Sequence, residues 1–190
     1  MLKEIITETT DAVVAAVQGV DNILDAVTGT VKDQVVGALQ GAGQVGGATV
    51  EAVASVASGA VKGVAQVGQS ITDTAAGTMS GVVKGVAQVG GDVVGAVRGS
   101  AQGLVSGVAD TGGDIGGAAV AAVQGAIKAT GETGADVAQA TQAAVGGVLD
   151  AAADLGGDAV GTVRNALLSA AALPRDVIEA AIKGSDDEKK

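Results

Sequence analysis

The chain has 190 residues, 32 of them glycine, and contains no cysteine, histidine or aromatic residue. Without cysteine or histidine it lacks a disulfide framework, a thiol nucleophile, a zinc ligand set and a histidine base, so we expect no enzyme and predict no cofactor. The 21 acidic residues outnumber the 11 basic ones, and a net charge of −10 makes nucleic acid a poor partner.

The chain begins with an acidic stretch, MLKEIITE, that lacks the long apolar run of a secretory signal. Further along, no segment of about 18 strongly apolar residues is free of frequent Gly, Gln or Ser, so we expect no membrane-spanning helix. We therefore predict a cytoplasmic protein and leave leaderless export open.

Two sets of glycines recur every 22 residues through a repeat region that we assign to residues 1–173. The first set is Gly46, Gly68, Gly90, Gly112, Gly134 and Gly156. The second set is Gly37, Gly59, Gly81, Gly103, Gly125 and Gly147. Two 11-residue units make up this period, and each unit corresponds to three turns of a slightly underwound α-helix. The spacing predicts a linear repeat whose function lies on a repeated surface.

On the 11-residue helical frame, apolar residues form one arc and most polar residues lie opposite. Val83, Val94 and Val105 share the apolar arc, and the glycines lie in it or beside it. Each helical glycine costs about 1 kcal/mol relative to alanine, which close packing against a neighbouring helix would offset. We therefore predict that the two glycine sets and the three valines form a helix-packing interface, with glycine notches that seat larger side chains of the neighbour.

The pattern favours an all-α fold built on the 22-residue repeat, with two helical arrangements. The favoured one is a nearly continuous amphipathic rod, roughly 240 Å long if residues 12–172 are helical. In the other, glycine ends one helix and aspartate caps the next at each Gly-Gly-Asp, which gives stacked helices of about 18 residues. A positive φ at Gly90, Gly112 and Gly156 would distinguish the stack from the rod. The alternative fold class is a β-solenoid with 22-residue coils, against which the Ala-rich stretch 118–124 argues.

Pro174 ends the repeat, and the sequence that follows changes in character. The residues RDVIEAAIK predict a short amphipathic helix within residues 174–184, with Asp176 as its cap. The last residues, 185–190, read SDDEKK and predict a disordered, charged tail.

Aspartates recur with the same 22-residue spacing at Asp92, Asp114, Asp136 and Asp158. Three of them have an acidic residue four positions earlier, and such pairs repel on a helix, which raises the hypothesis of a weak cation-binding edge. Two carboxylates are too few for a dedicated metal site, so the alternative is a solvated polar edge or, in the stacked arrangement, N-caps of helices, and we predict no metal ligand. Lys62, Lys84 and Lys128 share one position of the frame, and we expect them to snorkel or to pair with acidic residues of neighbouring helices.

The segments GAVKGVAQVG (59–68) and GVVKGVAQVG (81–90) resemble the 11-residue lipid-binding repeats of synucleins, and more loosely those of perilipins, bacterial phasins and late-embryogenesis proteins. The resemblance implies amphipathic helices that lie on a lipid or polymer surface. Two features depart from these families. The body of the chain is acidic and poor in lysine, and its regular glycines suit a protein neighbour better than a fluid lipid.

From these observations we expect a non-enzymatic structural protein. It would assemble with copies of itself through its Gly/Ala/Val helix faces into a filament, tube or bundle. The alternative is a peripheral amphipathic-helix coat on a membrane, lipid droplet or storage granule, and a second alternative is a protectant against desiccation or cold. The expected partner is therefore another copy of the chain, with a lipid surface as the alternative.

Overall fold

The computed structural model describes residues 2–17, 23–41, 46–68 and 70–188, and within these ranges the chain is helical and contains no strand. The helices are α1 (Leu2–Val17), α2 (Ile23–Gly41), α3 (Gly46–Gln66), α4 (Ile71–Gln88), α5 (Val93–Asp110), α6 (Ile115–Thr133), α7 (Val137–Leu155), α8 (Gly157–Ser169) and α9 (Arg175–Glu188). The all-α prediction is confirmed, and the β-solenoid alternative is wrong for the described residues.

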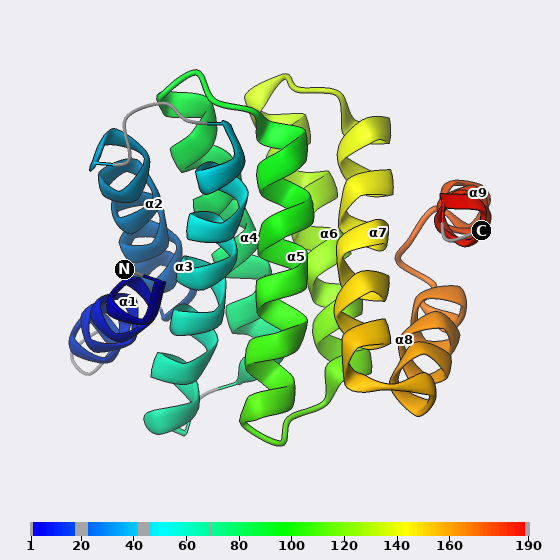
Figure 1. Cartoon of the computed structure of the whole chain (residues 1–190), viewed down its shortest axis with the longest axis horizontal. Coiled ribbons are helices and arrows are strands. Elements are labelled where there is room, and N and C mark those ends of the chain that lie inside the picture. The colour runs from blue at the N-terminus through cyan, green and yellow to red at the C-terminus, as the bar shows by residue number, and fades with distance from the viewer. Residues whose placement is uncertain (1, 18–22, 42–45, 69, 189–190) are drawn as a thin grey trace.

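The helices form a stack of two layers (Figure 1). Helices α1, α3, α5 and α7 lie side by side in the odd layer, and α2, α4, α6 and α8 lie side by side in the even layer. Each helix packs most extensively against a helix two places away along the chain. This is the organisation of a repeat protein, in which each unit contacts only its nearest neighbours.

The turn at Gly112 shows why the chain reverses where the 22-residue period marks it. Gly112 has a φ of 71°, a left-handed conformation that favours glycine. Its amide donates to the carbonyl of Ala109 (3.0 Å), and the amide of Gly113 donates to the carbonyl of Val108 (3.0 Å), which closes the end of α5. Asp114 then caps the start of α6. A positive φ also occurs at Gly68, Gly90, Gly134 and Gly156.

The continuous rod that we favoured from the sequence is wrong, because φ is positive at Gly90, Gly112 and Gly156. Helices α4 and α5 have 18 residues each, the length expected for stacked helices. The physical reason for the stack is burial. A straight rod leaves its aliphatic arc in water, whereas a chain that turns back can cover that arc with its own neighbouring helices.

Aliphatic side chains fill the space between the two layers. Val83 and Val105 are fully buried there, and Val94 is half-buried. The largest fully buried side chains include Met79 and Leu104. Because the chain has no aromatic rings, the helices must approach closely to fill this core, and the many small residues permit that approach.

Helix α9 ends the stack differently from the helices before it. Figure 1 shows α9 nearly end-on where α7 runs lengthwise, so α9 lies across the end of the odd layer. Ile178, Ala181 and Ile182 are its buried residues. The helix runs to Glu188, so residues 185–188, which we assigned to a disordered tail, belong to α9, and residues 189–190 lie outside the described part. None of the described helices is both long and apolar enough to cross a membrane.

Candidate functional site

The second glycine set lets neighbouring helices of one layer approach to backbone contact. A Cβ atom added to Gly81 of α4 would lie 2.6 Å from the carbonyl oxygen of Thr28 in α2. One added to Gly125 of α6 would lie 3.0 Å from the carbonyl oxygen of Ala76 in α4. A methyl group at either position would push the helices apart. The same contact, each time against the helix two places earlier, is made by Gly59, Gly103 and Gly147.

Threonine hydroxyls reinforce this packing in both layers. The hydroxyl of Thr10 in α1 donates to the carbonyl of Gly59 in α3 over 3.1 Å, and that of Thr28 in α2 donates to the carbonyl of Gly77 in α4 over 3.2 Å. Each hydroxyl reaches its acceptor only because glycine brings the two backbones close together. These close contacts at glycine join helices of a single chain.

The first glycine set lies at helix ends, not at a contact between helices. Its members in the described turns have φ between 70° and 118°, and an added Cβ atom would meet nothing within 4 Å. This corrects the predicted notches at Gly68, Gly90, Gly112, Gly134 and Gly156. Glycine is required at these positions because the backbone has a positive φ, and not because a neighbouring side chain fills the space. Gly46 is the first residue of α3, and its surroundings lie outside the described side chains.

Three of the four periodic aspartates are N-caps. The carboxylate of Asp92 accepts a hydrogen bond from the amide of Gly95 (3.0 Å), and that of Asp136 accepts one from the amide of Gln139 (2.9 Å). Asp114 accepts two such bonds. Asp158 lies inside the first turn of α8, whose N-cap position is occupied by a glycine without a side-chain hydrogen bond.

Lysines of neighbouring helices face two of the carboxylates that precede these caps. The ammonium group of Lys62 in α3 lies 2.8 Å from the carboxylate of Asp110 in α5, and that of Lys84 in α4 lies 3.1 Å from Glu132 in α6. The expected pairing with neighbouring helices thus occurs at two lysines, while Lys128 is exposed and has no ion pair among the described residues. No group of three or more acidic residues in the described part of the chain is placed to hold a metal ion.

A shallow groove runs between α5, α7 and α9, with a volume of about 360 Å³. It is lined by Val94, Arg98, Gln139 and Gln142 together with small residues of α7 and α9. The guanidinium group of Arg98 is bound to the carboxylate of Asp150, with both of its bonds to one oxygen (3.2 and 2.9 Å). Because this cation is already neutralised within the chain, the groove is a weak candidate for an anion site.

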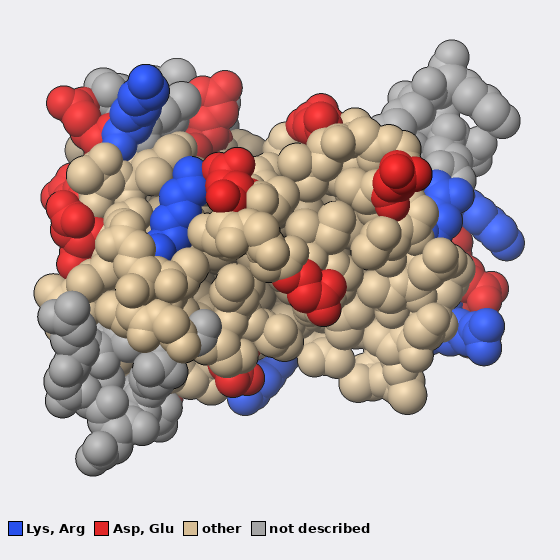
Figure 2. Space-filling view, turned by 90° about the horizontal axis from the view of Figure 1, so that it is seen from below, with Lys and Arg blue, Asp and Glu red and all other residues tan. Residues whose placement is uncertain are grey.

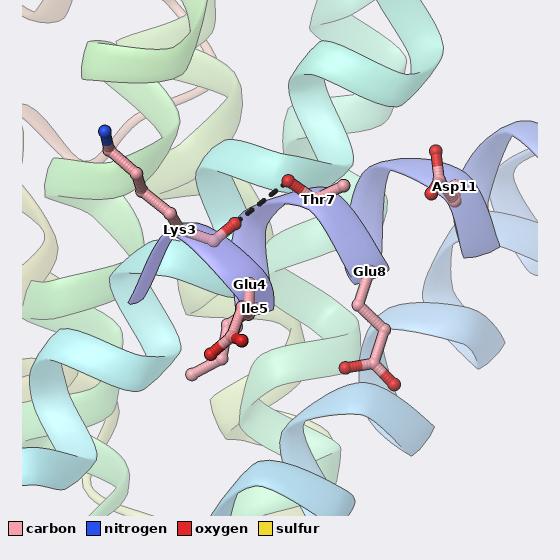
Figure 3. Close-up of a pocket in the computed structure, with 6 residues that line it drawn as sticks. All are labelled: Lys3, Glu4, Ile5, Thr7, Glu8 and Asp11. Atoms are coloured by element: carbon pink, nitrogen blue, oxygen red, sulfur yellow. Dashed lines mark hydrogen bonds between the residues drawn. The ribbon is translucent and has the colours of Figure 1, made fainter. Parts of the chain in front are cut away.

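A second hollow, of about 710 Å³, lies beside α1 at the first end of the stack (Figure 3). It is lined by Lys3, Glu4, Ile5, Thr7, Glu8 and Asp11. All of these belong to one helix, and Figure 3 shows Glu4, Ile5 and Glu8 pointing to the same side of it. The hydroxyl of Thr7 donates to the carbonyl of Lys3 over 3.0 Å and so is engaged within the helix. The hollow is an open, acidic surface and contains no catalytic constellation.

The outer face of α2 completes this end of the stack and is rich in glycine. Gly29, Gly37 and Gly41 share one face of the helix, and a Cβ atom on any of them would meet nothing within 4 Å. Asp33 lies between them, with 79% of its side chain exposed and its carboxylate 3.7 Å from the ammonium group of Lys32. Gly37 belongs to the second glycine set, yet it has no helix against it. The sequence pattern groups Gly37 with the packed members of the set. Its position as the first member, with no earlier repeat to pack against, was the signal that could have set it apart.

At the opposite end, the even layer finishes with α8. Val163 and Leu167 of this helix are buried in the core, while Val160, Arg164 and Leu168 are half-buried. Helix α9 packs more extensively on α7 than on α8. The two ends of the even layer, α2 and α8, are therefore the surfaces where the repeated packing stops.

No protein-family model matches the chain, and comparison with curated proteins finds no significant similarity.

Proposed function

We propose that this chain is a non-enzymatic structural protein that assembles with copies of itself. The observation that supports the proposal most directly is the open glycine face of α2. Gly37 and Gly41 lack the neighbouring helix that Gly81 and Gly85, their counterparts two repeats later, have within the chain. An exposed helical glycine lowers helix stability by about 1 kcal/mol relative to alanine, and a docked helix would offset that loss.

The proposed assembly uses the ends of the stack. The glycine faces of α3 to α7 are already covered within the chain, so they are not free to bind another copy. What remains for assembly is the open face of α2 at one end and the outer surfaces of α8 and α9 at the other. Because each repeat contacts only its neighbours, adding a copy at an end extends the stack without altering the rest.

The lipid-coat alternative receives no support from the packing. The aliphatic arc that would meet a lipid surface is buried between the two layers. Among the described residues the exposed large aliphatic side chains are Leu24, Val137 and Leu155, which belong to α2 and α7 and form no continuous face. A folded chain of this kind would have to open its layers before it could lie on lipid.

Sedimentation velocity and circular dichroism of the full chain in lipid-free buffer test the proposal. We expect a helical spectrum together with a mass that rises above the 17.8 kDa of the monomer as the protein concentration increases. A helical chain that stays at the monomer mass up to its solubility limit would contradict self-assembly. Phosphatidylcholine and phosphatidylserine vesicles serve as the control, because helicity that appears only with vesicles would instead favour the coat.

A further inference from the structure

We infer that Asp11 of α1 and Asp33 of α2 are stops at the first end of the stack, where the charge of their carboxylates hinders the docking of another helix. They restrain the proposed self-assembly through this end, so the inference rests on that proposal and adds a control to it. The two aspartates are 22 residues apart and occupy the same position of the repeat.

Inside the stack, the same repeat position is a contact between helices. Gly99 of α5 is buried there, and a Cβ atom added to it would lie 2.7 Å from the carbonyl oxygen of Val50 in α3. Gly77 of α4 is also buried, and a Cβ atom added to it would lie 3.3 Å from the carbonyl oxygen of Leu24 in α2. The backbone of a neighbouring helix therefore faces this position in both layers.

The residue type at this position follows the contact. From α1 to α7, the position holds Asp11, Asp33, Ser55, Gly77, Gly99, Ala121 and Ala143. The five small residues are buried or half-buried, whereas both aspartates are exposed. The hydroxyl of Ser55 donates to the carbonyl of Glu51 in its own helix over 2.9 Å, so it brings no unpaired polar group to the contact. On α8, which packs less extensively on α6, the position is Asn165 and is exposed. A charge therefore occurs at this position only where the chain leaves it uncovered.

The rest of this α2 face keeps the small residues that accept a neighbour. Gly37 and Gly41 follow Asp33 at intervals of four residues, so the three lie in one line along the helix. Their glycine counterparts in α4, Gly81 and Gly85, approach the backbone of α2. Solvation of an exposed face in general would favour polar residues along the whole line. Here one carboxylate interrupts a line of glycines, at a position that is a contact inside the stack.

A helix docked as α2 docks on α4 would bring carbonyl oxygens against the carboxylate. Carbonyl and carboxylate oxygens both accept hydrogen bonds, so neither provides a donor to the other. The carboxylate would lose water without gaining a partner, which is unfavourable for a charged group. Lys32 of the same helix has its ammonium group 3.7 Å from the carboxylate of Asp33, too far for a hydrogen bond. The charge at Asp33 therefore opposes a close contact at this position.

The charges around the two aspartates act in the same direction. Glu4 and Glu8 are further exposed acidic residues of α1, and Figure 3 shows them pointing to the same side of that helix. In Figure 2 acidic side chains lie at this end of the molecule, on the left, with basic side chains among them. Two copies that met through their first ends would bring these carboxylates together, and like charges repel.

Substitutions in the full chain separate charge from size at these positions. Asp33→Asn removes the charge at nearly constant size. The double variant Asp11→Ala/Asp33→Ala gives α1 and α2 the residue that α6 and α7 carry at this position. Asp154→Asn is the control, because it removes the same charge from an exposed carboxylate in the last turn of α7, away from the first end. Circular dichroism melts establish that each variant is folded.

Sedimentation velocity over a concentration series measures the protein concentration at which half of the chains are assembled. We expect Asp33→Asn to lower this concentration about tenfold, and the double alanine variant to lower it at least as far, because the unfavourable charge is removed. Asp154→Asn should match wild type.

The outcomes distinguish this inference from the proposed function. If wild type assembles and the variants at the first end assemble no better than Asp154→Asn, the inference is wrong while self-assembly stands. An effect of the double alanine variant without one of Asp33→Asn would show that size and not charge hinders docking, and would also overturn it. If wild type stays at the 17.8 kDa monomer mass while both first-end variants assemble, the stops are supported and self-assembly of the native chain is contradicted. Monomers throughout would overturn both.

Discussion

At the scale of single residues, glycine has two distinct physical roles in this chain. Gly112 and its counterparts adopt a left-handed backbone that ends a helix. Gly81 and its counterparts have ordinary helical backbone and are needed because the carbonyl of a neighbouring helix lies where a side chain would begin. The identical 22-residue spacing of the two sets gave no hint of this difference, because it appears only when a neighbour is placed beside the helix.

Replacement of Gly81 with alanine separates packing from helix propensity. The added methyl group would lie 2.6 Å from a backbone oxygen that cannot rotate away, so we expect Gly81→Ala to destabilise the fold by about 1–3 kcal/mol. At the open position Gly131, the same substitution should stabilise the fold by up to about 1 kcal/mol through helix propensity alone. Urea denaturation followed by circular dichroism measures both changes. If both substitutions change the free energy of unfolding in the same direction, the packing role of Gly81 is contradicted.

At the scale of secondary-structure elements, the Gly-Gly-Asp sequence is a complete helix-to-helix junction. The glycines end α5 with two backbone hydrogen bonds, and Asp114 begins α6 by accepting from the amides of Gly116 and Gly117 at 3.0 Å each. These interactions are local, so the sequence predicted this junction as one of its two helical arrangements. The sequence did not decide that the junction is used, because an uninterrupted helix satisfies the same backbone groups.

Loss of the cap at Asp114 is expected to weaken the stack. Asp114→Ala leaves two amides at the start of α6 without their acceptor, which should lower the free energy of unfolding by about 0.5–2 kcal/mol. Asp158→Ala is the control, because Asp158 follows the N-cap of α8 and caps no amide, and it should cost about 0.3–1 kcal/mol through the helix dipole alone. Chemical denaturation measures the free energy of unfolding of both variants. A larger loss in Asp158→Ala than in Asp114→Ala would show that the cap at Asp114 contributes little to stability.

At the scale of the whole molecule, stability comes from contacts between neighbouring helices along the stack. Helices in the middle, such as α5, have packed neighbours on both sides within their layer, while α1 and α2 have one on one side only. A chain organised in this way unfolds most readily from its ends. The same one-sided packing at α2 is what leaves a glycine face available for another copy.

Amide hydrogen exchange should therefore show a gradient along the stack. We expect the slowest exchange in α4, α5 and α6, and the fastest in α1 and α9, under conditions where the chain is monomeric. Assembly should add protection chiefly to α2. Mass spectrometry of peptides after exchange measures both effects. Uniform protection across the helices would indicate a single cooperative core and contradict the repeat-like distribution of stability.

The sequence by itself determined the helical class, the repeat period and the positions where a turn was possible, because each depends on residues within one or two helical turns. It also identified the buried arc that includes Val83 and Val105. Only the tertiary structure decided between rod and stack, separated the two glycine roles and showed that Gly37 is open. These outcomes depend on contacts such as that of Thr28 with Gly77, which are 49 positions apart. The free energy that selects them comes from burial between distant helices, and a local pattern does not report which helices meet.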